Sequence, residues 1–512
     1  MGGVVDLERL SKAANVGIVA FAVAAFFAGY HVSFYYHFLT VGFAMLVGLN
    51  FYYRHVQKEH ALLSNFGFMA QVRYVLESIG PELRQYLFMS DTEERPFNRV
   101  QRSEVYRKAK GVDSSEAFGS LLDFDGSEFK LLHSLYPVPK SELEPYSLTF
   151  GEERGIAQTH VMTKPLMISA MSFGSLGEHA IRALARGAKQ AGVLMNTGEG
   201  GYPKHHLAEG CDLIFQMGTA KFGVRNDDAS LNDEKLRAIA DLEPVRVIEL
   251  KLSQGAKPGK GGLLPKEKIS QEISDLRGVP MDRDVVSPPS HVECHDAAST
   301  VALLARVQEV SGLPVGIKLC LGRDRELGEL IAEMKRQDVL PDYIAIDGAE
   351  GGTGAAPKAF MDDFGTPLFQ ALPAVHRLLQ EHGVRDRLKL FAAGKLINPG
   401  RQITAMSLGA DAVYSARGFM LALGCIQALH CNTNGCPVGI TTHDPGLQAG
   451  LDIQKKSERV VNYVHALDHD WYELLSALGR RTFRDLDESN VLMPARLSLL
   501  DRTGQGVAGG AP

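Results

Sequence analysis

The chain has 512 residues, 45% of them hydrophobic and 22% charged, which is enough for a large buried core with attached segments. Its 54 basic and 60 acidic residues give a net charge of −6, and this balance excludes a general affinity for nucleic acid. Six cysteines in so long a chain do not make a disulfide framework, so a reducing compartment is expected.

The first 60 residues differ in composition from the rest. Residues 13–30 and 38–53 carry no charge, and each segment is near the lower limit of length for crossing a bilayer. Tyrosines lie at the ends of these segments, and basic residues lie outside both: Arg9, Lys12, Arg54 and Lys58. The pattern predicts a transmembrane helical hairpin over residues 1–60 in the cell membrane, with both termini, and so the large domain that follows the hairpin, in the cytoplasm. A cleaved signal peptide and a pair of buried helices are the alternatives; a second apolar segment directly after the first argues against cleavage.

Residues 61–164 are polar and irregular, and no catalytic motif falls among them. Helices are expected at 70–78 and 82–88, followed by a stretch rich in Ser, Asp and Pro at 113–145. We interpret this segment as a linker and an N-terminal collar.

From residue 165 onward, short apolar runs alternate with helical patterns. Eight such runs are present: 166–171, 193–196, 213–217, 245–252, 315–319, 343–347, 388–393 and 412–416. Continuous apolar strands separated by helices imply a parallel sheet covered on both faces, and this count indicates an α/β fold, a (β/α)8 TIM barrel, over 165–465. An open doubly wound sheet would favour a G-x-G-x-x-G turn after the first run, which this chain lacks. Helices at 471–478 and 483–486 and a flexible tail complete the segment 466–512.

Glycine-rich loops follow most of these runs, where the active-site loops of a barrel emerge. They are SAMSFGS (169–175), NTGEGG (196–201), KLSQGAKPGKGG (251–262), DGAEGGTGAAP (347–357), AAGKLINPG (392–400) and YSARG (414–418). Glycine lets backbone N–H groups approach an anion or a flat ring closely. The loops after runs seven and eight are where barrels commonly bind phosphate, so a phosphorylated cofactor is expected there.

Three of the six cysteines, Cys425, Cys431 and Cys436, form a C-x5-C-x4-C pattern after the last run. Thiolates at this spacing, with turn residues between them, suit an iron–sulfur cluster. A zinc site would need a fourth ligand, supplied irregularly by His430 or His443. Buried cysteines that pack as small hydrophobes are the third alternative. The other cysteines have no companions at ligand spacing and are interpreted as packing residues: Cys211, Cys294 and Cys320.

From about residue 166 to 463 the chain resembles the FMN-binding synthase domain of the glutamate synthases, in particular the shorter glutamate-synthase-like proteins. The motifs follow in order: SAMSFGS, NTGEGG, QMGTAKFGV, QGAKPGKGGLLP, SPPSH, DGAEGGTGAAP and GC-x5-C-x4-CPVGI. The resemblance implies a barrel that binds FMN and a [3Fe–4S] cluster ligated by Cys425, Cys431 and Cys436. In that family FMN is reduced through the cluster, ammonia condenses with 2-oxoglutarate to an imine, and hydride from flavin N5 gives glutamate.

Residue types at the matching positions suit that chemistry. Lys257 and Arg277 match the family's substrate-binding positions, and Lys251 and Gln254 on the same loop as Lys257 are expected to line the site. Lys318 would place positive charge near flavin N1 and O2, the alternative being a surface lysine. Glu199 would shuttle protons during imine formation, the alternative being a carboxylate that only orders its loop.

The resemblance also implies the residues around FMN. Expected at the ring and nearby are Met171, Ser172, Gln216, Lys318, Asp347, Gly351, Gly352 and Thr353, and expected at the phosphate are Gly394, Gly400 and Gly418. His291 in SPPSH is expected either to face the pocket or to have a structural role.

Two departures from the family pattern make the pocket less polar. Leu263 replaces a glutamine of the GGQLP segment that contacts substrate, and Tyr202 follows NTGEGG where an acid is common. Losing an amide donor from a buried carboxylate site would cost about 1–3 kcal/mol. A substrate other than 2-oxoglutarate is therefore an open alternative.

No glutaminase domain is expected, because Met1 leads into the apolar segments where full glutamate synthases begin with a nucleophilic cysteine. No flavin-reductase domain is recognisable either. We therefore expect ammonia or an amine from a separate source, and electrons from ferredoxin or a membrane donor. Two hypotheses follow: a reductive synthase making glutamate or a related amino acid such as N-methylglutamate, and a membrane-tethered redox relay acting on another substrate.

Overall fold

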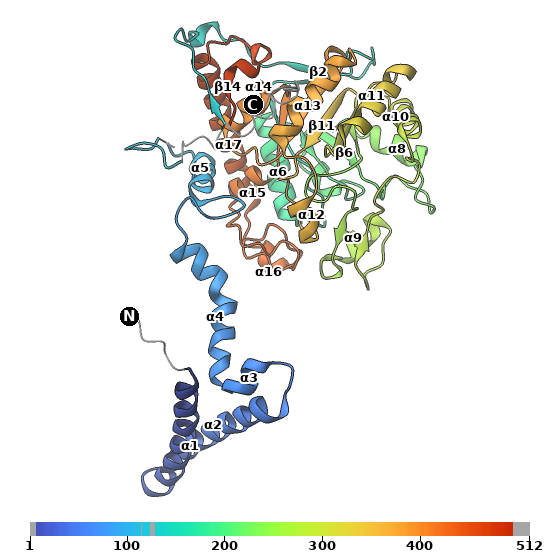
Figure 1. The fold of residues 1–512 in the computed structure, drawn as a ribbon. Helices are drawn as coiled ribbons and strands as arrows, with labels where there is room; N and C mark the ends of the chain where they lie inside the picture. Colours follow the sequence, from blue (N-terminus) through green and yellow to red (C-terminus); the bar gives the residue numbers. More distant parts are fainter. Residues whose placement is uncertain (1–6, 114, 123–128, 495–512) are drawn as a thin grey trace, which may run out of the picture. The chain divides into compact units, whose positions relative to one another are not determined.

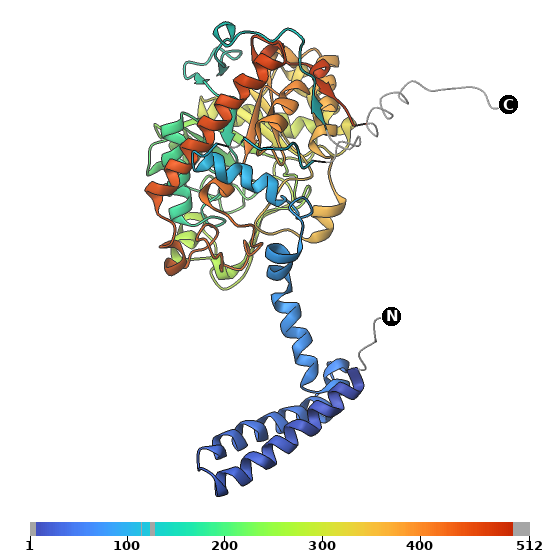
Figure 2. The same cartoon turned by 90° about the vertical axis from the view of Figure 1, so that its left-hand side faces the viewer.

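The computed structural model describes residues 7–113, 115–122 and 129–494. Two compact units divide the chain, residues 1–98 and residues 99–512. Both units are seen in Figures 1 and 2.

The first unit is helical. Helices α1 (Leu7–His31) and α2 (Tyr36–Phe51) lie side by side and antiparallel, with the rings of Phe21 and Phe43 stacked at a centroid distance of 5.8 Å (Figures 1 and 2). The residues of the two expected helices, 70–78 and 82–88, are helical, but they form one continuous run rather than two helices, because Pro81 lies inside α4 without ending it. The remaining elements of the unit are the π-helical η1 (Tyr52–Val56), α3 (Ala61–Phe66), α4 (Met69–Leu83) and the π-helical η2 (Arg84–Phe88).

The second unit is built on a closed parallel barrel of eight strands. Strand β13 pairs back onto β4, with Val413 opposite Leu166, so the sheet has no free edge. All eight apolar runs of the sequence form these strands, which confirms the predicted TIM barrel. The strands are β4 (Leu166–Ile168), β5 (Met195–Asn196), β6 (Leu213–Met217), β7 (Val245–Lys251), β10 (Val315–Leu319), β11 (Tyr343–Asp347), β12 (Lys389–Ala393) and β13 (Ala412–Ser415).

Helices cover the outside of the barrel because the longer ones have an apolar stripe that must be buried against the strands. In α6, for example, Ile181, Leu184 and Ala188 are fully buried. The helices of this unit are α5 (Arg99–Ala109), α6 (Glu178–Ala191), α7 (Lys204–Leu207), α8 (Asp233–Ala240), α9 (Gln271–Arg277), α10 (Ala297–Ser311), α11 (Asp324–Gln337), α12 (Lys358–Asp363), α13 (Leu368–Glu381), α14 (Pro399–Ser407), α15 (Arg417–Leu423), α16 (Pro445–Gln448) and α17 (Ile453–Ala477).

Short elements close the ends of the barrel. Phe150 of the β2–β3 hairpin packs against the rings of Tyr343 and Phe391, each at a centroid distance of 5.8 Å, and so plugs the end where the strands begin. The active-site loops emerge at the opposite end. The paired short strands are β1 (Lys130–Leu131) with β14 (Val491–Leu492), β2 (Leu148–Phe150) with β3 (His160–Met162), and β8 (Leu263–Leu264) with β9 (Val285–Val286); the 3-10 turns are η3 (Lys140–Glu142), η4 (Lys266–Lys268), η5 (Arg385–Arg387), η6 (Phe483–Asp485) and η7 (Glu488–Asn490).

The last long helix differs from the expectation. The predicted helix at 471–478 is only the final part of α17, which has 25 residues. The first half of α17 was not predicted because charged residues interrupt its apolar residues in the sequence. Val460, Tyr463 and Val464 nevertheless form a buried stripe on one side of the helix. Trp471 donates from its indole N–H to Gln402 Oε1 at 2.7 Å and so attaches α17 to the barrel. The predicted flexible tail lies outside the described residues.

Candidate active site

Five buried side chains from five strands form a hydrogen-bonded network inside the barrel. Glu249 of β7 accepts at Oε1 from Asn196 Nδ2 (2.8 Å) and Gln216 Nε2 (2.7 Å). Its Oε2 accepts from the hydroxyls of Tyr343 (2.9 Å) and Tyr414 (2.8 Å). Because Glu249 lies two positions before Lys251 on the same strand, both side chains point into the barrel and the network lies beneath Lys251. Gln216, expected near FMN, thus directs its amide N–H to this network.

Above the network, an acid and a cation from neighbouring loops form a buried ion pair. Lys251 Nζ lies 2.8 Å from Glu199 Oε1 and donates to Gln254 Oε1 at 3.0 Å. Burial raises the pKa of Glu199, but Lys251, Lys257 and Arg277 outweigh it and hold the pKa below its usual range. Glu199 is therefore ionised at neutral pH.

Two further cations surround this pair. Lys257 Nζ donates to the carbonyl of Ala355 at 3.0 Å, and Arg277 Nη2 donates to the carbonyl of Phe173 at 2.6 Å. Burial lowers the pKa of Lys257 to about 8 and that of Arg277 to about 10, while Glu199 acts in the opposite direction on both. Glu199 Oε2 and Arg277 Nε are buried with no hydrogen-bond partner among the described residues. Unpaired buried polar atoms beside an excess of positive charge fit a site for an anionic ligand.

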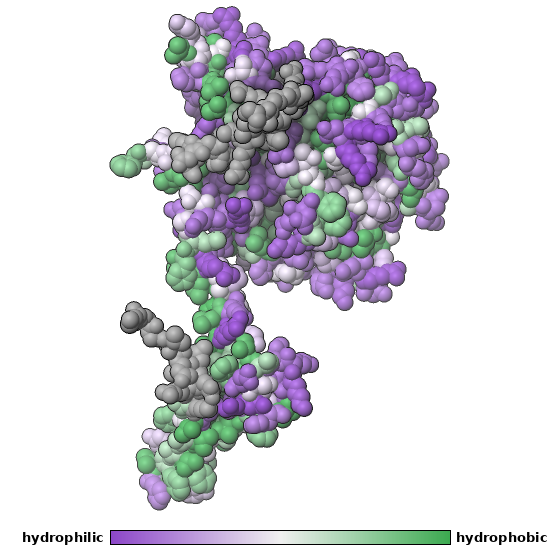
Figure 3. Space-filling model, in the orientation of Figure 1, coloured by the Kyte–Doolittle hydropathy of each residue, from purple (hydrophilic) through white to green (hydrophobic). Residues whose placement is uncertain are grey.

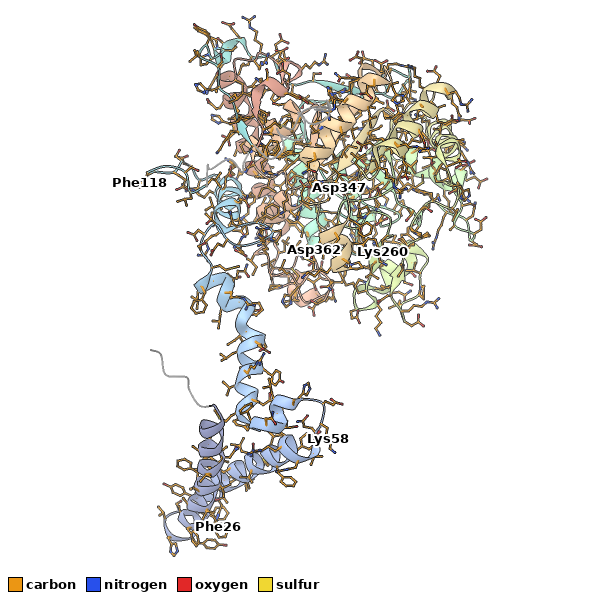
Figure 4. The ribbon with its side chains drawn as sticks, in the orientation of Figure 1. Phe26, Lys58, Phe118, Lys260, Asp347 and Asp362 are labelled. Atoms are coloured by element: carbon orange, nitrogen blue, oxygen red, sulfur yellow. The ribbon has the colours of Figure 1, made fainter. Side chains whose placement is uncertain are left out.

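Lys318 lies at the end of β10 with only 4% of its surface exposed, so the alternative of a surface lysine is wrong. Its Nζ lies 3.9 Å from Asp347 Oδ2 and 5.4 Å from the centroid of the Tyr414 ring. Asp347, labelled in Figure 4, also accepts a hydrogen bond at Oδ2 from the backbone N–H of Gly255 at 3.0 Å. Three strand ends thus meet around one cation at the top of the barrel.

Met171 and Ser172, expected beside a flavin ring, follow β4. Gly198 approaches them so closely that a Cβ there would lie 2.7 Å from Ser172 N, and its φ of +64° also requires glycine. The Met171 carbonyl lies 3.1 Å from Nε2 of His206, whose pKa burial lowers to about 4. His206 is therefore neutral, and its contact with the Met171 carbonyl holds this loop in position.

The glycine turn after β11 lies against Arg417. A Cβ at Gly352 would lie 3.0 Å from Arg417 Cδ, and Arg417 Nη2 donates to the carbonyl of Glu350 at 2.7 Å. Gly351 donates its N–H to the Gly348 carbonyl at 2.8 Å, and Thr353 Oγ1 lies 3.5 Å from the Ala355 carbonyl. Arg417 was not predicted from the sequence, although it lies within the YSARG loop singled out there.

The expected phosphate residues lie where the last two strands end. Gly394 has a φ of +148°, and Gly400 lies in the first turn of α14, whose N-cap Asn398 accepts from Arg401 N at 2.9 Å. A Cβ at Gly418 would lie 2.6 Å from the Tyr463 hydroxyl. Backbone N–H groups at a helix N-terminus and small residues in tight turns fit a phosphate group.

A small pocket lies beside Lys251. Its lining residues are Thr219, Lys251, Leu252, Ser253, Gln254, Gly259, Lys260, Gly261, Gly262 and Pro289. Lys260, labelled in Figure 4, lies with its Nζ 5.6 Å from the ring centroid of Phe360, so α12 borders the same loop. Leu263 follows this lining directly and pairs with Val286, while Tyr202 is 41% exposed. His291 contacts the carbonyl of Lys251 through Nε2 at 3.0 Å, and burial lowers its pKa to about 4.

Residues 425–443, which carry the three cysteines and are called the cysteine loop below, are held by hydrogen bonds from two other segments. Tyr106 of α5 donates to the carbonyl of Cys425 at 2.6 Å, and Lys268 of η4 donates to the carbonyl of Cys431 at 3.2 Å. Among the described residues, no three His, Cys, Asp or Glu side chains converge closely enough to hold a single metal ion. Thiolates that bind different irons of one cluster lie farther apart than the ligands of one ion, so this finding bears on zinc rather than on a cluster.

The three thiols act on one another and differ in their surroundings. Burial raises the pKa of Cys425 to about 11 and also raises the pKa of Cys431. For Cys436, burial acts in the same direction, but hydrogen bonds from the backbone N–H groups of Thr441, Val438 and Ile440 and from the Thr441 hydroxyl lower the pKa. N–H groups directed at a sulfur stabilise its thiolate, the form that binds iron. The surroundings of Cys436 therefore fit a thiolate ligand of an iron–sulfur cluster.

Some residues of this region had only a weak signal in the sequence, or none. Glu249 could have been noticed, because it is the first of two charged residues at alternate positions of the strand VRVIELK. Lys268 and Tyr106 gave no signal, because each lies in a polar segment among other charged residues.

Comparison with known proteins decides the family. Residues 138–481 match the conserved region in glutamate synthase. The chain belongs to the glutamate synthase family. The glutamate synthase large subunit-like protein YerD of Bacillus subtilis is 38% identical over 462 residues, which cover 83% of this chain and 88% of that protein. The archaeal-type glutamate synthase [NADPH] of Thermotoga neapolitana is 35% identical over 324 residues, or 63% of this chain and 61% of that protein.

Solved structures resemble the family member described here only distantly. A flavocytochrome b2 variant with benzoylformate has a TM-score of 0.45 and 14% identity over 81% of this chain and 83% of that chain. A mandelate oxidase variant has a TM-score of 0.43 and 14% identity over 83% of this chain and 99% of that chain. Membership of the glutamate synthase family confirms the resemblance drawn from the motifs and the prediction of a glutamate synthase-type oxidoreductase.

Proposed function

We propose that the chain is an FMN-dependent oxidoreductase that reductively aminates 2-oxoglutarate or a related 2-oxo acid. We further propose that it receives electrons from an external donor through a [3Fe–4S] cluster on Cys425, Cys431 and Cys436. The proposal is carried by one observation: Lys251, Lys257 and Arg277 surround Glu199 where the barrel strands end, with buried polar atoms left for a ligand. This arrangement suits an oxo acid with a second carboxylate.

Each of these residues has a role in such a reaction. Bound FMN would supply hydride, and the cluster would supply single electrons to it. Lys257 and Arg277 would hold the carboxylates, and Lys318 would set the charge near the flavin. Glu199, ionised and buried, would accept a proton when the amine attacks the keto carbon, and would return a proton when water leaves.

The proposal is tested by single turnover under anaerobic conditions. The purified full chain is reduced with dithionite, excess reductant is removed, and 2-oxoglutarate is added with ammonia, with methylamine or with no amine. Recovery of flavin absorbance that requires both 2-oxoglutarate and an amine, with glutamate or N-methylglutamate as product, is expected. Flavin-replete protein that shows no reoxidation dependent on 2-oxoglutarate would contradict the proposed substrate.

Binding of the oxo acid should weaken at high pH. Burial lowers the pKa of Lys257 to about 8, so its amine is charged below that pH and neutral above it. If a carboxylate needs this charge, the affinity falls above about pH 8, by up to about tenfold per pH unit. The dissociation constant, read from the change in flavin absorbance between pH 6.5 and pH 9.5, checks this expectation.

Substitutions of Lys257 test whether this residue, rather than another titrating group, causes the pH dependence of binding. Lys257→Arg keeps the charge over this range and should remove the pH dependence, whereas Lys257→Gln should bind weakly at every pH. A pH dependence that persists unchanged in Lys257→Gln would assign it to another residue.

A second candidate function is a membrane-tethered redox relay that acts on a less polar substrate. It is favoured by Leu263, which directly follows the pocket residue Gly262 at the position where the family commonly has glutamine. If the turnover test fails for 2-oxoglutarate, 2-oxo acids with apolar side chains are the next substrates to assay.

We also propose that α1 and α2 cross a membrane as a hairpin. Within the described residues, one helical stretch, Ala13–His31, is long and apolar enough to span a bilayer, with a mean hydropathy of 1.8 and 6% of it buried. Helix α2 has 16 residues and continues directly into η1. Apolar residues cover much of the surface of this region in Figure 3. Phe21 and Phe27 are among the exposed apolar side chains. Such a surface is unstable in water unless lipid or protein covers it.

The hairpin is tested by extraction of membranes from expressing cells. The full chain should stay in the pellet after alkaline carbonate treatment, and its intact mass should include residues 13–53. The double substitution Phe21→Asp and Phe43→Asp should move the chain to the soluble fraction, since each charge at a helix centre costs about 2.5–3.5 kcal/mol in a bilayer. Tyr136→Asp, on the exposed surface of the second unit, is the control. Release of the unaltered chain by carbonate would contradict a membrane span.

A further inference from the structure

Lys268 is a buried cation between two loops that have different tasks. It lies in η4, on the segment between β8 and α9, and only 3% of its surface is exposed. Its Nζ donates to the carbonyl of Ser175 at 2.6 Å and to the carbonyl of Cys431 at 3.2 Å. Ser175 belongs to the loop after β4 that contains Met171 and Ser172, and Cys431 belongs to the cysteine loop. One ammonium group thus joins the two loops directly.

Other contacts hold the same two loops together. The backbone N–H of Gly177 donates to the carbonyl of Ile440 at 3.0 Å, and His443 contacts the carbonyl of Gly174 through Nε2 at 3.1 Å. Burial lowers the pKa of His443 to about 4, so it is neutral and contributes no charge. The charge at this junction therefore comes from Lys268, and the neutral contacts supply alignment.

The buried positive charge of Lys268 lacks the carboxylate partner that such a charge usually has. Among the described residues, no carboxylate lies within ion-pair distance of its Nζ, although nearly every buried charge in proteins is paired. The nearest groups that can carry opposite charge are the thiols of Cys431 and Cys436, while Arg277 adds positive charge. A buried ammonium whose nearest anions are cysteines is explained if those cysteines are thiolates of an anionic cluster.

We propose that Lys268 is a positioning residue for electron transfer: its buried charge raises the reduction potential of the cluster held by Cys425, Cys431 and Cys436, and its two hydrogen bonds fix the cysteine loop against the loop at the flavin. This inference rests on the cofactors proposed above. The cluster, when bound, would supply single electrons to the flavin, and no bond to Lys268 would form or break. The charge favours the reduced cluster because reduction adds one negative charge beside a cation.

The test uses the full chain, purified without oxygen, with four substitutions. Lys268→Gln keeps hydrogen-bond donors without the charge, Lys268→Met removes both, and Lys268→Arg keeps the charge. Lys266→Gln is the matched control, since Lys266 lies in the same turn but is exposed. For each protein, flavin absorbance, iron content and the electron paramagnetic resonance signal of the cluster are recorded during a redox titration.

Lys268→Gln and Lys268→Met should each lower the equilibrium constant for cluster reduction about tenfold, a shift of about 59 mV for one electron. Lys268→Arg and Lys266→Gln should stay within twofold of the unaltered protein. Loss of iron from Lys268→Gln and Lys268→Met alone, with flavin retained, would also support the proposal, because the charge then holds the cysteine loop. A cluster in Lys268→Gln with the same potential as in Lys266→Gln would overturn it. Unaltered protein that binds flavin but no iron would instead overturn the proposed cluster itself.

Discussion

Cys436→Ser should abolish the iron–sulfur cluster while leaving the flavin site intact. Cys436 is the one cysteine of the three whose pKa is lowered, because N–H groups of Thr441, Val438 and Ile440 are directed at its sulfur. Serine is a poor ligand for iron, and a cluster with three protein ligands cannot lose one without losing its attachment. We expect iron content and the paramagnetic signal to fall below a tenth of those of the unaltered protein.

Flavin content is the readout that separates this result from misfolding. The residues expected around FMN lie at the strand ends of the barrel and do not include the cysteine loop, so flavin absorbance should remain. One-electron donors should then reduce the flavin at least about a hundredfold more slowly, whereas photochemical reduction should proceed. Cys294→Ser, which changes a cysteine outside the cysteine loop, is the control. Full iron content in Cys436→Ser would show that Cys436 is not a ligand.

The barrel could be predicted from the sequence because its strands are short apolar runs that are buried on both faces. Runs such as 213–217 and 343–347 match β6 and β11 residue for residue, and a glycine-rich loop follows most of the runs at the end where a barrel binds ligands. The cationic residues could be predicted for a similar reason, since Lys251 and Lys257 lie on one such loop. The chemistry of the site is therefore largely local in the sequence.

What could not be predicted depends on contacts between distant segments. Glu249 accepts hydrogen bonds from Tyr343 and Tyr414, which lie 94 and 165 positions farther along the chain. Lys268 meets Cys431 across 163 positions, and in the sequence it is one of several lysines in a polar stretch. No periodicity or motif encodes such pairs. They follow only from the closure of the barrel, which brings the loops after β4, β7 and β13 together.

Glu199→Gln should lower kcat by about 10²–10⁴-fold, the range for loss of a general acid–base group. The carboxylate is ionised and buried, its Oε1 is paired with Lys251, and its Oε2 has no hydrogen-bond partner among the described residues. Oε2 is therefore the atom available to exchange a proton with a bound substrate. Glutamine keeps the size and one carbonyl oxygen but cannot take up the proton.

The effect on KM distinguishes proton transfer from the alternative that Glu199 only orders its loop. Removing one negative charge leaves Lys251, Lys257 and Arg277 around the substrate, so a dicarboxylate should bind as tightly as before or more tightly, and KM should not rise. A disordered loop would instead raise KM and lower flavin content, because Gly198 of the same loop packs against Ser172. Glu267→Gln, an exposed acid in η4, should change neither constant. A rise in KM with unchanged kcat in Glu199→Gln would therefore show that Glu199 only orders its loop and that another group transfers the proton.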